Sequence, residues 1–334
     1  MNRRKLLQSL VAGGGVAALG SRVGVDGRVL AAQTARPAAP TPASARTRYR
    51  GPIVDVHMHA YPAAEAIDPG LGNPVTGKPP GVKDGEAHRI ACMAEMARLN
   101  IVKGVVSGGT GDRLAAAIHW RDGAPDKLIA GAGVRGSEDT PLPPVPVLRD
   151  AFTSGKLRVL GEVTAQYAGR SLSDPIYDPY LALCEELDIP VALHTGMGPP
   201  GTSFDPCCRG FRASLGNPSL IEEALNRHPK LRVNLMHAAW PYLADTVALM
   251  TIYPQVHVDL GALGWGLPRD EFHSYLGALR RAGFVKRVMF GSDHMYWPDL
   301  IGVAVEGVDA APFLTAADKQ AIFHDNAVRF YKLG

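Results

Sequence analysis

The sequence predicts an α/β chain that folds as a (β/α)8 TIM barrel, and three observations support this fold class. Short apolar runs rich in β-branched residues alternate with amphipathic segments from residue 52 to the C-terminus. The alternation occurs eight times, which favours a closed parallel barrel over an open sheet. The chain has 334 residues, 46% of them hydrophobic, which is enough for one barrel with a sizeable core.

The expected strands are apolar along their length, as is usual when both faces of a parallel sheet are buried. In chain order they span residues 53–56, 102–106, 128–133, 158–163, 190–194, 231–236, 256–260 and 287–290. The segments between them have helical periodicity, and the first places Ile90, Met93, Ala94 and Ala97 on one face. The expected helices span residues 86–99, 114–120, 145–153, 180–187, 219–227, 242–251 and 271–282, and a closing helix spans residues 316–331.

The main alternative architecture is a doubly wound open sheet. That fold would place a glycine-rich, phosphate-binding turn directly after its first strand. In this chain the first strand runs into His57-Met58-His59 instead. The barrel is therefore the predicted fold, and we assign residues 51–334 to it.

The N-terminal segment has the features of an export signal. Arg3-Arg4-Lys5 precedes a glycine-rich apolar stretch, Leu6 to Leu19, that is too short for a convincing membrane span. Residues 1–32 thus resemble a twin-arginine signal peptide, and residues 33–50, rich in Pro, Ala and Thr, are expected to be a disordered linker. We expect a protein exported by the twin-arginine machinery to the periplasm or beyond, without stable membrane insertion after processing. An uncleaved basic anchor is the alternative.

The charge distribution argues against a nucleic-acid partner. The formal net charge is +3, but nine of the 35 Lys and Arg residues and only one of the 32 acidic residues lie within residues 1–50. The remaining chain therefore has 26 basic and 31 acidic side chains, and it has no basic footprint for nucleic acid. We expect a small-molecule substrate instead, and a homo-oligomer is compatible with the sequence.

The four cysteines do not form a recognisable framework. Cys92, Cys184, Cys207 and Cys208 show no CxxC spacing, and a chain of this length rarely depends on disulfides. A bridge between the adjacent residues Cys207 and Cys208 would be strained. We therefore expect all four to be unpaired.

The most informative feature is the position of histidines and carboxylates at predicted strand ends. His57 and His59 follow the first strand, and Glu162, His194, His237 and Asp293 end the fourth, fifth, sixth and eighth strands. The carboxyl ends of all strands meet at one face of a parallel barrel. Side chains two residues apart on a strand point to the same side, so both imidazoles of the HxH pair should face one point. Imidazole nitrogens with a carboxylate suit zinc or a similar divalent ion.

The same segments carry a resemblance to the amidohydrolase superfamily, in particular its amidohydrolase-2 branch. They are Val54-Asp55-Val56-His57-Met58-His59, Gly161-Glu162-Val163, Val191-Ala192-Leu193-His194-Thr195-Gly196, Asn234-Leu235-Met236-His237-Ala238, Phe290-Gly291-Ser292-Asp293 and Asn326-Ala327-Val328-Arg329-Phe330. The resemblance covers residues 51–332 and specifies no substrate.

The resemblance implies roles for individual residues. His57, His59, His194 and Asp293 would be metal ligands, and His237 would bind a second ion or act as an acid/base group. Relatives with two ions have a shared carboxylate at the position of Glu162. The segment after it, Val163-Thr164-Ala165, departs from that pattern, so Glu162 is either a ligand, which we favour, or a polar barrel residue.

The expected reaction is hydrolysis by a metal-activated water, acting on an ester, lactone or amide bond. Asp293 would serve as general base and then acid, and His237 would stabilise negative charge or donate a proton. The alternatives are a metal-dependent non-oxidative decarboxylase of an aromatic or muconate-type acid and a non-catalytic periplasmic binding protein. Five residues are expected to contact the substrate: Arg135, Trp240, Trp265, Tyr296 and Trp297.

Overall fold

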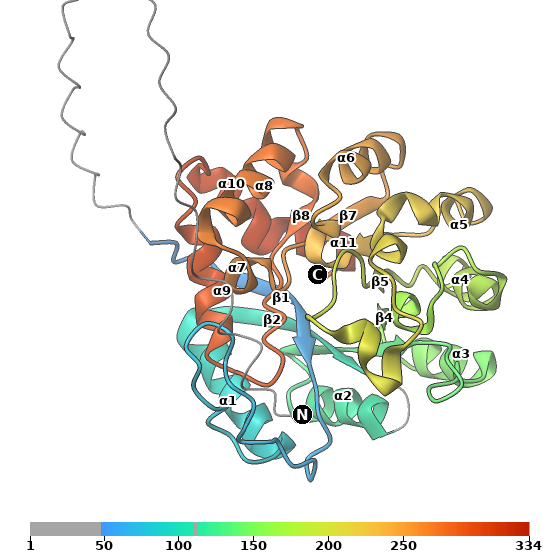
Figure 1. Ribbon diagram of the computed structural model, residues 1–334, viewed down its shortest axis with the longest axis horizontal. Coiled ribbons are helices and arrows are strands. Elements are labelled where there is room, and N and C mark those ends of the chain that lie inside the picture. The colour runs from blue at the N-terminus through green and yellow to red at the C-terminus, as the bar shows by residue number, and fades with distance from the viewer. Residues whose placement is uncertain (1–47, 110–111, 334) are drawn as a thin grey trace, which may run out of the picture. The chain divides into compact units, whose positions relative to one another are not determined.

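A computed structural model describes residues 48–109 and 112–333 of the chain. The proposed signal peptide and residues 33–47 of the proposed linker lie outside the described residues. Within the described part, eight parallel strands are hydrogen-bonded in sequence order, as Figure 1 shows from one side. The predicted (β/α)8 barrel is thereby confirmed.

The strands are short, and each pairs in parallel with the next one along the chain. Their bounds are β1 (Ile53–His59), β2 (Ile101–Gly108), β3 (Leu128–Val134), β4 (Val159–Val163), β5 (Val191–Leu193), β6 (Val233–Leu235), β7 (Val256–Asp259) and β8 (Val288–Met289). The segment after β8 returns to β1: the Val56 amide donates to the Phe290 carbonyl at 3.0 Å, and the Asp293 amide donates to the His57 carbonyl at 2.8 Å. These bonds join the last strand to the first and position Asp293 beside β1.

Helices surround the strands and connect them. They are α1 (Gly85–Leu99), α2 (Asp112–Gly123), α3 (Val145–Thr153), α4 (Asp178–Glu186), α5 (Glu222–Arg227), α6 (Leu243–Ile252), α7 (Leu263–Gly266), α8 (Arg269–Arg281), α9 (Leu300–Asp309), α10 (Ala316–Gln320) and α11 (Asn326–Tyr331). Shorter helical turns are η2 (Ala165–Ala168), η3 (Pro175–Tyr177), η4 (Thr202–Phe204), η5 (Pro206–Cys208), η6 (Ala213–Gly216), η7 (Pro218–Ile221), η8 (Met236–Ala239), η9 (Val285–Arg287) and the π-helical η10 (Ala321–Asp325).

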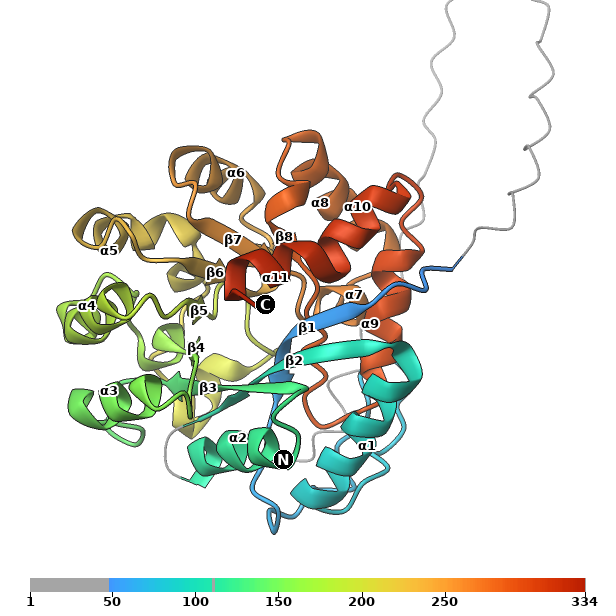
Figure 2. The same ribbon diagram turned by 180° about the vertical axis from the view of Figure 1, so that it is seen from behind.

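Two apolar clusters hold the barrel together. The larger one joins the strands to the surrounding helices and includes Trp120 and Phe272. The smaller one joins apolar residues of β1 to β5 and β8 to Ala327, Phe330 and Tyr331 of α11, and Figure 2 shows α11 beside the strands. The C-terminal helix therefore packs against strand residues.

The structure contains helices that were not predicted from the sequence. The closing helix predicted over residues 316–331 consists of α10, η10 and α11 in succession. The helix α9 was not predicted, although Leu300, Ile301, Ala304, Val305 and Val308 have helical spacing and are all buried. It is the next helix after β8, where we expected only the loop leading to the closing helix.

The expectation that all cysteines are unpaired is wrong for two of them. Cys207 and Cys208 form a disulfide, while Cys92 and Cys184 are free and buried. The 3₁₀ turn η5 ends on this pair, and the turn brings the two adjacent sulfurs together. The prediction considered only the strain expected in a disulfide between adjacent residues, and this strain argued against the bridge.

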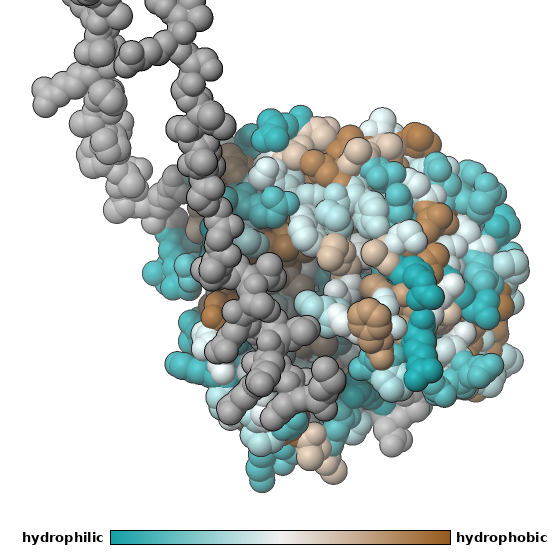
Figure 3. Space-filling model, viewed as in Figure 1, coloured by the Kyte–Doolittle hydropathy of each residue, from teal (hydrophilic) through white to brown (hydrophobic). Residues whose placement is uncertain are grey.

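The surface carries no broad apolar region on the face seen in Figure 3, where hydrophilic and hydrophobic residues are interspersed outside the grey atoms. The large exposed apolar residues of the described chain are far apart in sequence, for example Ile90, Val147, Phe204 and Ile252. Among the described residues, no helix combines the length and the hydrophobicity that crossing a membrane requires.

Candidate metal centre

The six residues predicted as metal ligands gather at the carboxyl ends of the strands. Most of the positions differ slightly from the expected strand ends. His57 and His59 lie within the last three residues of β1 rather than after it, and Glu162 is the penultimate residue of β4. His194 follows β5 directly, and Asp293 lies four residues beyond β8. His237 lies in the turn η8 after β6.

Asp293 lies between three of the histidines. Its Oδ1 is 2.8 Å from His59 Nε2 and 3.6 Å from His57 Nε2, and its Oδ2 is 3.8 Å from His237 Nδ1. The two imidazoles of the HxH pair thus face the same carboxylate, as their spacing on β1 predicts. One carboxylate from the end of the barrel therefore connects β1 with β6.

Glu162 occupies the opposite side of the group. Its Oε2 is 3.8 Å from His59 Nε2, and its Oε1 is 3.9 Å from His237 Nε2. The ring of His194 packs edge-on against the ring of His237, with centroids 4.8 Å apart. The ligand atoms of Glu162, His194 and His237 all lie within 4.8 Å of one another, as do those of His57, His59 and Glu162. Glu162 is therefore shared by two possible ligand groups.

Three of the four histidines are oriented by an acceptor at Nδ1. His57 Nδ1 is 3.4 Å from Asp259 Oδ1, His194 Nδ1 is 3.0 Å from the Gln166 side-chain oxygen, and His237 Nδ1 is 2.9 Å from the carbonyl of residue 261. An oxygen acceptor at Nδ1 fixes that proton and leaves the lone pair on Nε2. In the neutral form, which a metal ligand requires, all three histidines thus offer Nε2 as a ligand atom.

The Nε2 atoms of His57 and His237 are the clearest sign that the group is built for an ion. Both are buried and have no hydrogen-bond partner among the described residues. A buried polar nitrogen without a partner is costly, and native proteins rarely contain one without a reason. A divalent cation would satisfy both atoms, so the residues present fit a metal.

Electrostatics at the site favour a cation. Burial opposes the charge of Asp293, but the neighbouring imidazoles outweigh it and lower the pKa of Asp293 to about 2. The pKa of Glu162 is also lowered, since the surrounding histidines outweigh the effect of burial. Burial alone would lower the pKa of His57, yet Asp293 and Asp259 raise it to about 10. The pKa of Asp259 is also lowered, because the charge of His57 outweighs burial, so three ionised carboxylates surround this centre.

His194 behaves differently from His57. Burial is the main cause that lowers its pKa, to about 3, and the charge of His237 adds to the effect. His194 is therefore neutral at physiological pH, which is the protonation state that a metal ligand requires.

The backbone at the site adopts conformations that are uncommon for non-glycine residues. His237 has φ 59° and Asp293 has φ 48°, both in the left-handed region. Hydrogen bonds hold them there: the His237 amide donates to Asp259 Oδ1 at 3.1 Å, and the Asp293 amide donates to the His57 carbonyl at 2.8 Å. Such strain is characteristic of functional sites.

Glycine makes room for His57. A Cβ on Gly291 would lie 2.7 Å from the Cβ of His57, and a Cβ on Gly261 would clash with its Nδ1. Both positions therefore require a residue without a side chain, because any larger residue would displace the imidazole.

The predicted substrate-binding residues have partners of their own. The guanidinium of Arg135 lies 5.3 Å from the ring centroid of Tyr167, whose hydroxyl is 3.5 Å from His194 Nε2. Arg135 Nη1 also lies 3.8 Å from the sulfur of Cys208. Arg135 is thus one residue removed from the candidate ligands, and its role in binding substrate stays a prediction.

The four aromatic residues are tied into the loops above the barrel. Their ring nitrogens or faces are engaged, and each is partly buried. The indole N–H of Trp240 donates to Glu271, and that of Trp265 donates to the Ser292 carbonyl. The indole N–H of Trp297 donates to the Leu71 carbonyl, and the ring of Tyr296 stacks on Tyr61. Trp265 thereby holds the residue before Asp293. Their contact with a substrate also stays a prediction.

Sequence reasoning missed two residues that orient the histidines. Asp259 ends β7 and accepts hydrogen bonds from the His237 amide, the residue 261 amide and Asn234 Nδ2. Gln166 donates to two backbone carbonyls while its oxygen faces His194. Asp259 had a detectable signal, because it is a carboxylate at the end of an apolar strand. Gln166 lies in the turn after β4, where no sequence pattern identifies it.

Comparison with known proteins identifies the family. The sequence pattern of the family described as Amidohydrolase matches residues 54–333, which is nearly the whole described part of the chain. Protein fluG of Emericella nidulans is 24% identical over 115 residues. That match covers 34% of this chain and only 12% of the length of protein fluG.

Solved structures share the fold. A probable 2-pyrone-4,6-dicarboxylic acid hydrolase from Acinetobacter baumannii superposes with a TM-score of 0.58 at 15% identity, covering 84% of this chain and 99% of that chain. A 2,6-dihydroxybenzoate decarboxylase from Rhizobium superposes with a TM-score of 0.52 at 16% identity, covering 83% of this chain and 99% of that chain. At these identities the likeness concerns the fold alone.

Proposed function

Because the chain belongs to the Amidohydrolase family, we propose that it is a metal-dependent hydrolase that cleaves an ester, lactone or amide bond of a small molecule. One observation carries the proposal. Within the described part of the chain, the buried Nε2 atoms of His57 and His237 have no hydrogen-bond partner, and they face the ionised carboxylates of Asp293 and Glu162. Zinc is the ion we propose, since imidazole and carboxylate ligands suit it.

The proposed chemistry divides between the ion and the protein. A bound divalent ion lowers the pKa of a water molecule towards about 7 and polarises the substrate oxygen. Asp293 takes the proton of the attacking water and returns it to the leaving group. Its lowered pKa, about 2, keeps this carboxylate ionised at neutral pH. The hydrogen bond that the Asp293 amide donates to the His57 carbonyl of β1 holds this residue in place during both transfers.

Glu162 and His237 decide how many ions the centre holds. In a two-ion site, Glu162 would be the shared ligand, with His57 and His59 holding one ion and His194 and His237 the other. In a one-ion site, His237 would be free to donate a proton; without metal its pKa is raised despite burial, since Glu162 and Asp293 favour the charged imidazole. We favour the shared ligand because Glu162 belongs to two of the three groups of close ligand atoms at this centre, one containing His59 and the other His194.

The test is turnover by the purified chain on a panel of lactones, esters, amides and phosphoesters, in water enriched in ¹⁸O. Hydrolysis incorporates ¹⁸O into the product and releases no CO2. The other reaction considered for this family, non-oxidative decarboxylation, releases CO2 from an aromatic or muconate-type acid without incorporating ¹⁸O. Metal-dependent release of CO2 as the sole reaction would overturn the proposed hydrolysis and retain the metal site.

We also propose that the chain is exported. The proposal rests on the residue pattern of residues 1–32, with Arg3-Arg4 before an apolar stretch. Replacing both arginines with lysine should leave the protein in the cytoplasm, which cell fractionation would detect. Unchanged export of that variant would argue against the twin-arginine route.

A further inference from the structure

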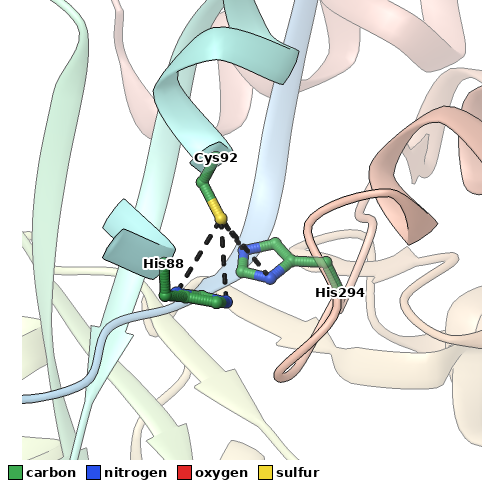
Figure 4. A group of neighbouring side chains, drawn as sticks. All are labelled: His88, Cys92 and His294. Carbon is green, nitrogen blue, oxygen red and sulfur yellow. Dashed lines mark hydrogen bonds between the residues drawn. The ribbon is translucent and has the colours of Figure 1, made fainter. Parts of the chain in front are cut away.

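A second group of metal-binding side chains lies between α1 and the loop after β8. His88 and Cys92 stand one helical turn apart on α1, on the same face, and His294 follows Asp293 in the loop. Figure 4 shows the thiol of Cys92 between the two imidazoles. All three residues are fully buried. The sequence patterns singled out neither His88 nor His294.

One carbonyl settles which nitrogen of each imidazole is free. The Met295 carbonyl lies 2.8 Å from His88 Nε2 and 3.0 Å from His294 Nδ1. Since a carbonyl only accepts hydrogen bonds, both of these nitrogens carry protons. The lone pairs are therefore on His88 Nδ1 and His294 Nε2. A backbone carbonyl that fixes the tautomer of a histidine is a usual companion of a metal ligand.

The two free nitrogens lie close to the thiol. Cys92 Sγ is 3.9 Å from His88 Nδ1 and 3.8 Å from His294 Nε2. Around a tetrahedral zinc ion, a thiolate sulfur and an imidazole nitrogen stand about 3.5 Å apart. The three ligand atoms lie within 4.8 Å of one another. The sulfur is about as close to the protonated nitrogens, at 3.7 Å from His88 Nε2 and 3.9 Å from His294 Nδ1, so both rings must turn their free nitrogens towards it to bind an ion.

From this geometry we propose that His88, Cys92 and His294 bind one thiophilic metal ion of the Zn²⁺ or Cu⁺ type, separate from the candidate metal centre. A thiolate with two imidazoles selects these ions over Mg²⁺ and Ca²⁺, which prefer oxygen. The ion would replace the thiol proton of Cys92.

The surroundings suit a structural site rather than a catalytic one. The ring of Tyr61 packs edge-on against the ring of His88, with centroids 5.1 Å apart. The ring centroids of Trp120 and His88 are 5.7 Å apart. These aromatic rings shield the group from solvent. Because His294 directly follows Asp293, an ion at this point would also tie the loop carrying Asp293 to α1.

Thiolate coordination gives a test that the candidate metal centre cannot imitate, because that centre offers only nitrogen and oxygen ligands. The background is the full chain with Cys207→Ser and Cys208→Ser, in which Cys92 and Cys184 are the only thiols. Metal-free protein is titrated with Co²⁺, as a probe for Zn²⁺, and separately with Cu⁺ under anaerobic conditions. Ultraviolet absorption from thiolate-to-metal charge transfer is the readout, and elemental analysis counts the ions.

We expect one equivalent of Co²⁺ or Cu⁺ to produce the charge-transfer absorption. Adding Cys92→Ser should abolish it and lower the metal content by one ion per chain, whereas the matched change Cys184→Ser, at the other buried thiol, should alter neither. If Cys92→Ser prevents folding, His88→Gln replaces it, since this variant keeps the thiol and removes one nitrogen ligand. Absence of the absorption with both ions in the folded background would overturn the proposal, as would its persistence in Cys92→Ser.

Discussion

The strands of this barrel carry two opposite environments. At their carboxyl ends, buried histidines and carboxylates shift one another's pKa, and two of these residues have left-handed backbone conformations. Elsewhere on the same strands, Val105, Ile129 and Val159 pack with Phe330 of α11 in an apolar cluster. One region stores unsatisfied polar groups, and the other gains free energy from apolar burial. The comparison indicates that the free energy gained by apolar burial offsets the cost of the strained polar region.

The largest effect should come from removing the proposed proton acceptor at the polar region. Asp293→Asn keeps the size of the side chain and its backbone bond to β1 but removes the base. Once a substrate is known, turnover should fall by about 10²–10⁴-fold, with thermal unfolding little changed. Measurement of kcat at equal metal loading separates the loss of the base from a loss of the ion. Turnover close to that of the unaltered chain, with metal bound, would show that Asp293 is not the base.

The apolar region should respond in stability and not in metal binding. Phe330 is 3% exposed, and Phe330→Ala should lower the free energy of unfolding by about 3–5 kcal/mol. The matched control is Phe204→Ala, because Phe204 is 88% exposed and its loss should cost less than about 0.5 kcal/mol. Denaturant unfolding checks both values. A loss of metal from folded Phe330→Ala protein would contradict the separation of the two regions.

Asp259 tests whether the polar region depends on residues behind the ligands. Asp259→Asn replaces the carboxylate that orients His57 and accepts a hydrogen bond from the His237 amide. Metal affinity should therefore fall by about 10–100-fold. Competition with a chromophoric chelator measures the affinity directly. His57→Gln removes the ligand itself and should weaken binding further. An Asp259→Asn variant with unchanged affinity would mean that Asp259 has no part in positioning the ligands.

The smallest effect separates the two regions by pH in metal-free protein. Burial opposes the charge of His57, but Asp293 and Asp259 raise its folded pKa to about 10, so its stabilisation is complete below pH 6.5 and is lost as pH rises towards 10. Burial lowers the folded pKa of His257, whose ring packs on Phe330, from 6.5 to about 4. Stability from His257 is therefore lost as pH falls from 6.5 to 4.

Thermal unfolding across this pH range checks both signs. His57→Gln should flatten the alkaline loss, and His257→Phe should flatten the acid loss. An alkaline loss that is unchanged in His57→Gln would assign it to other groups, and the pH contrast between the two regions would fail.

The barrel could be predicted from the sequence because the pattern that specifies it, an apolar strand followed by a helix, is local and repeats along the chain. Each strand is an apolar run, and topology alone brings residues as distant as His57 and Asp293 to one face. The predictions were weaker wherever the information is not periodic. The orienting role of Gln166 depends on a turn after β4, and the Cys207–Cys208 disulfide depends on the local turn η5. His294 was overlooked because its partners lie on α1, more than 200 residues earlier.

The central claim is that the ligands at the strand ends hold a divalent ion that the reaction requires. The most direct measurement is metal content and turnover on the same sample, before and after chelation and after return of one divalent ion at a time. We predict that chelation abolishes turnover, that zinc restores it, and that Glu162→Gln lowers the metal content of this centre from two ions to one. Full turnover by metal-depleted protein would contradict the claim.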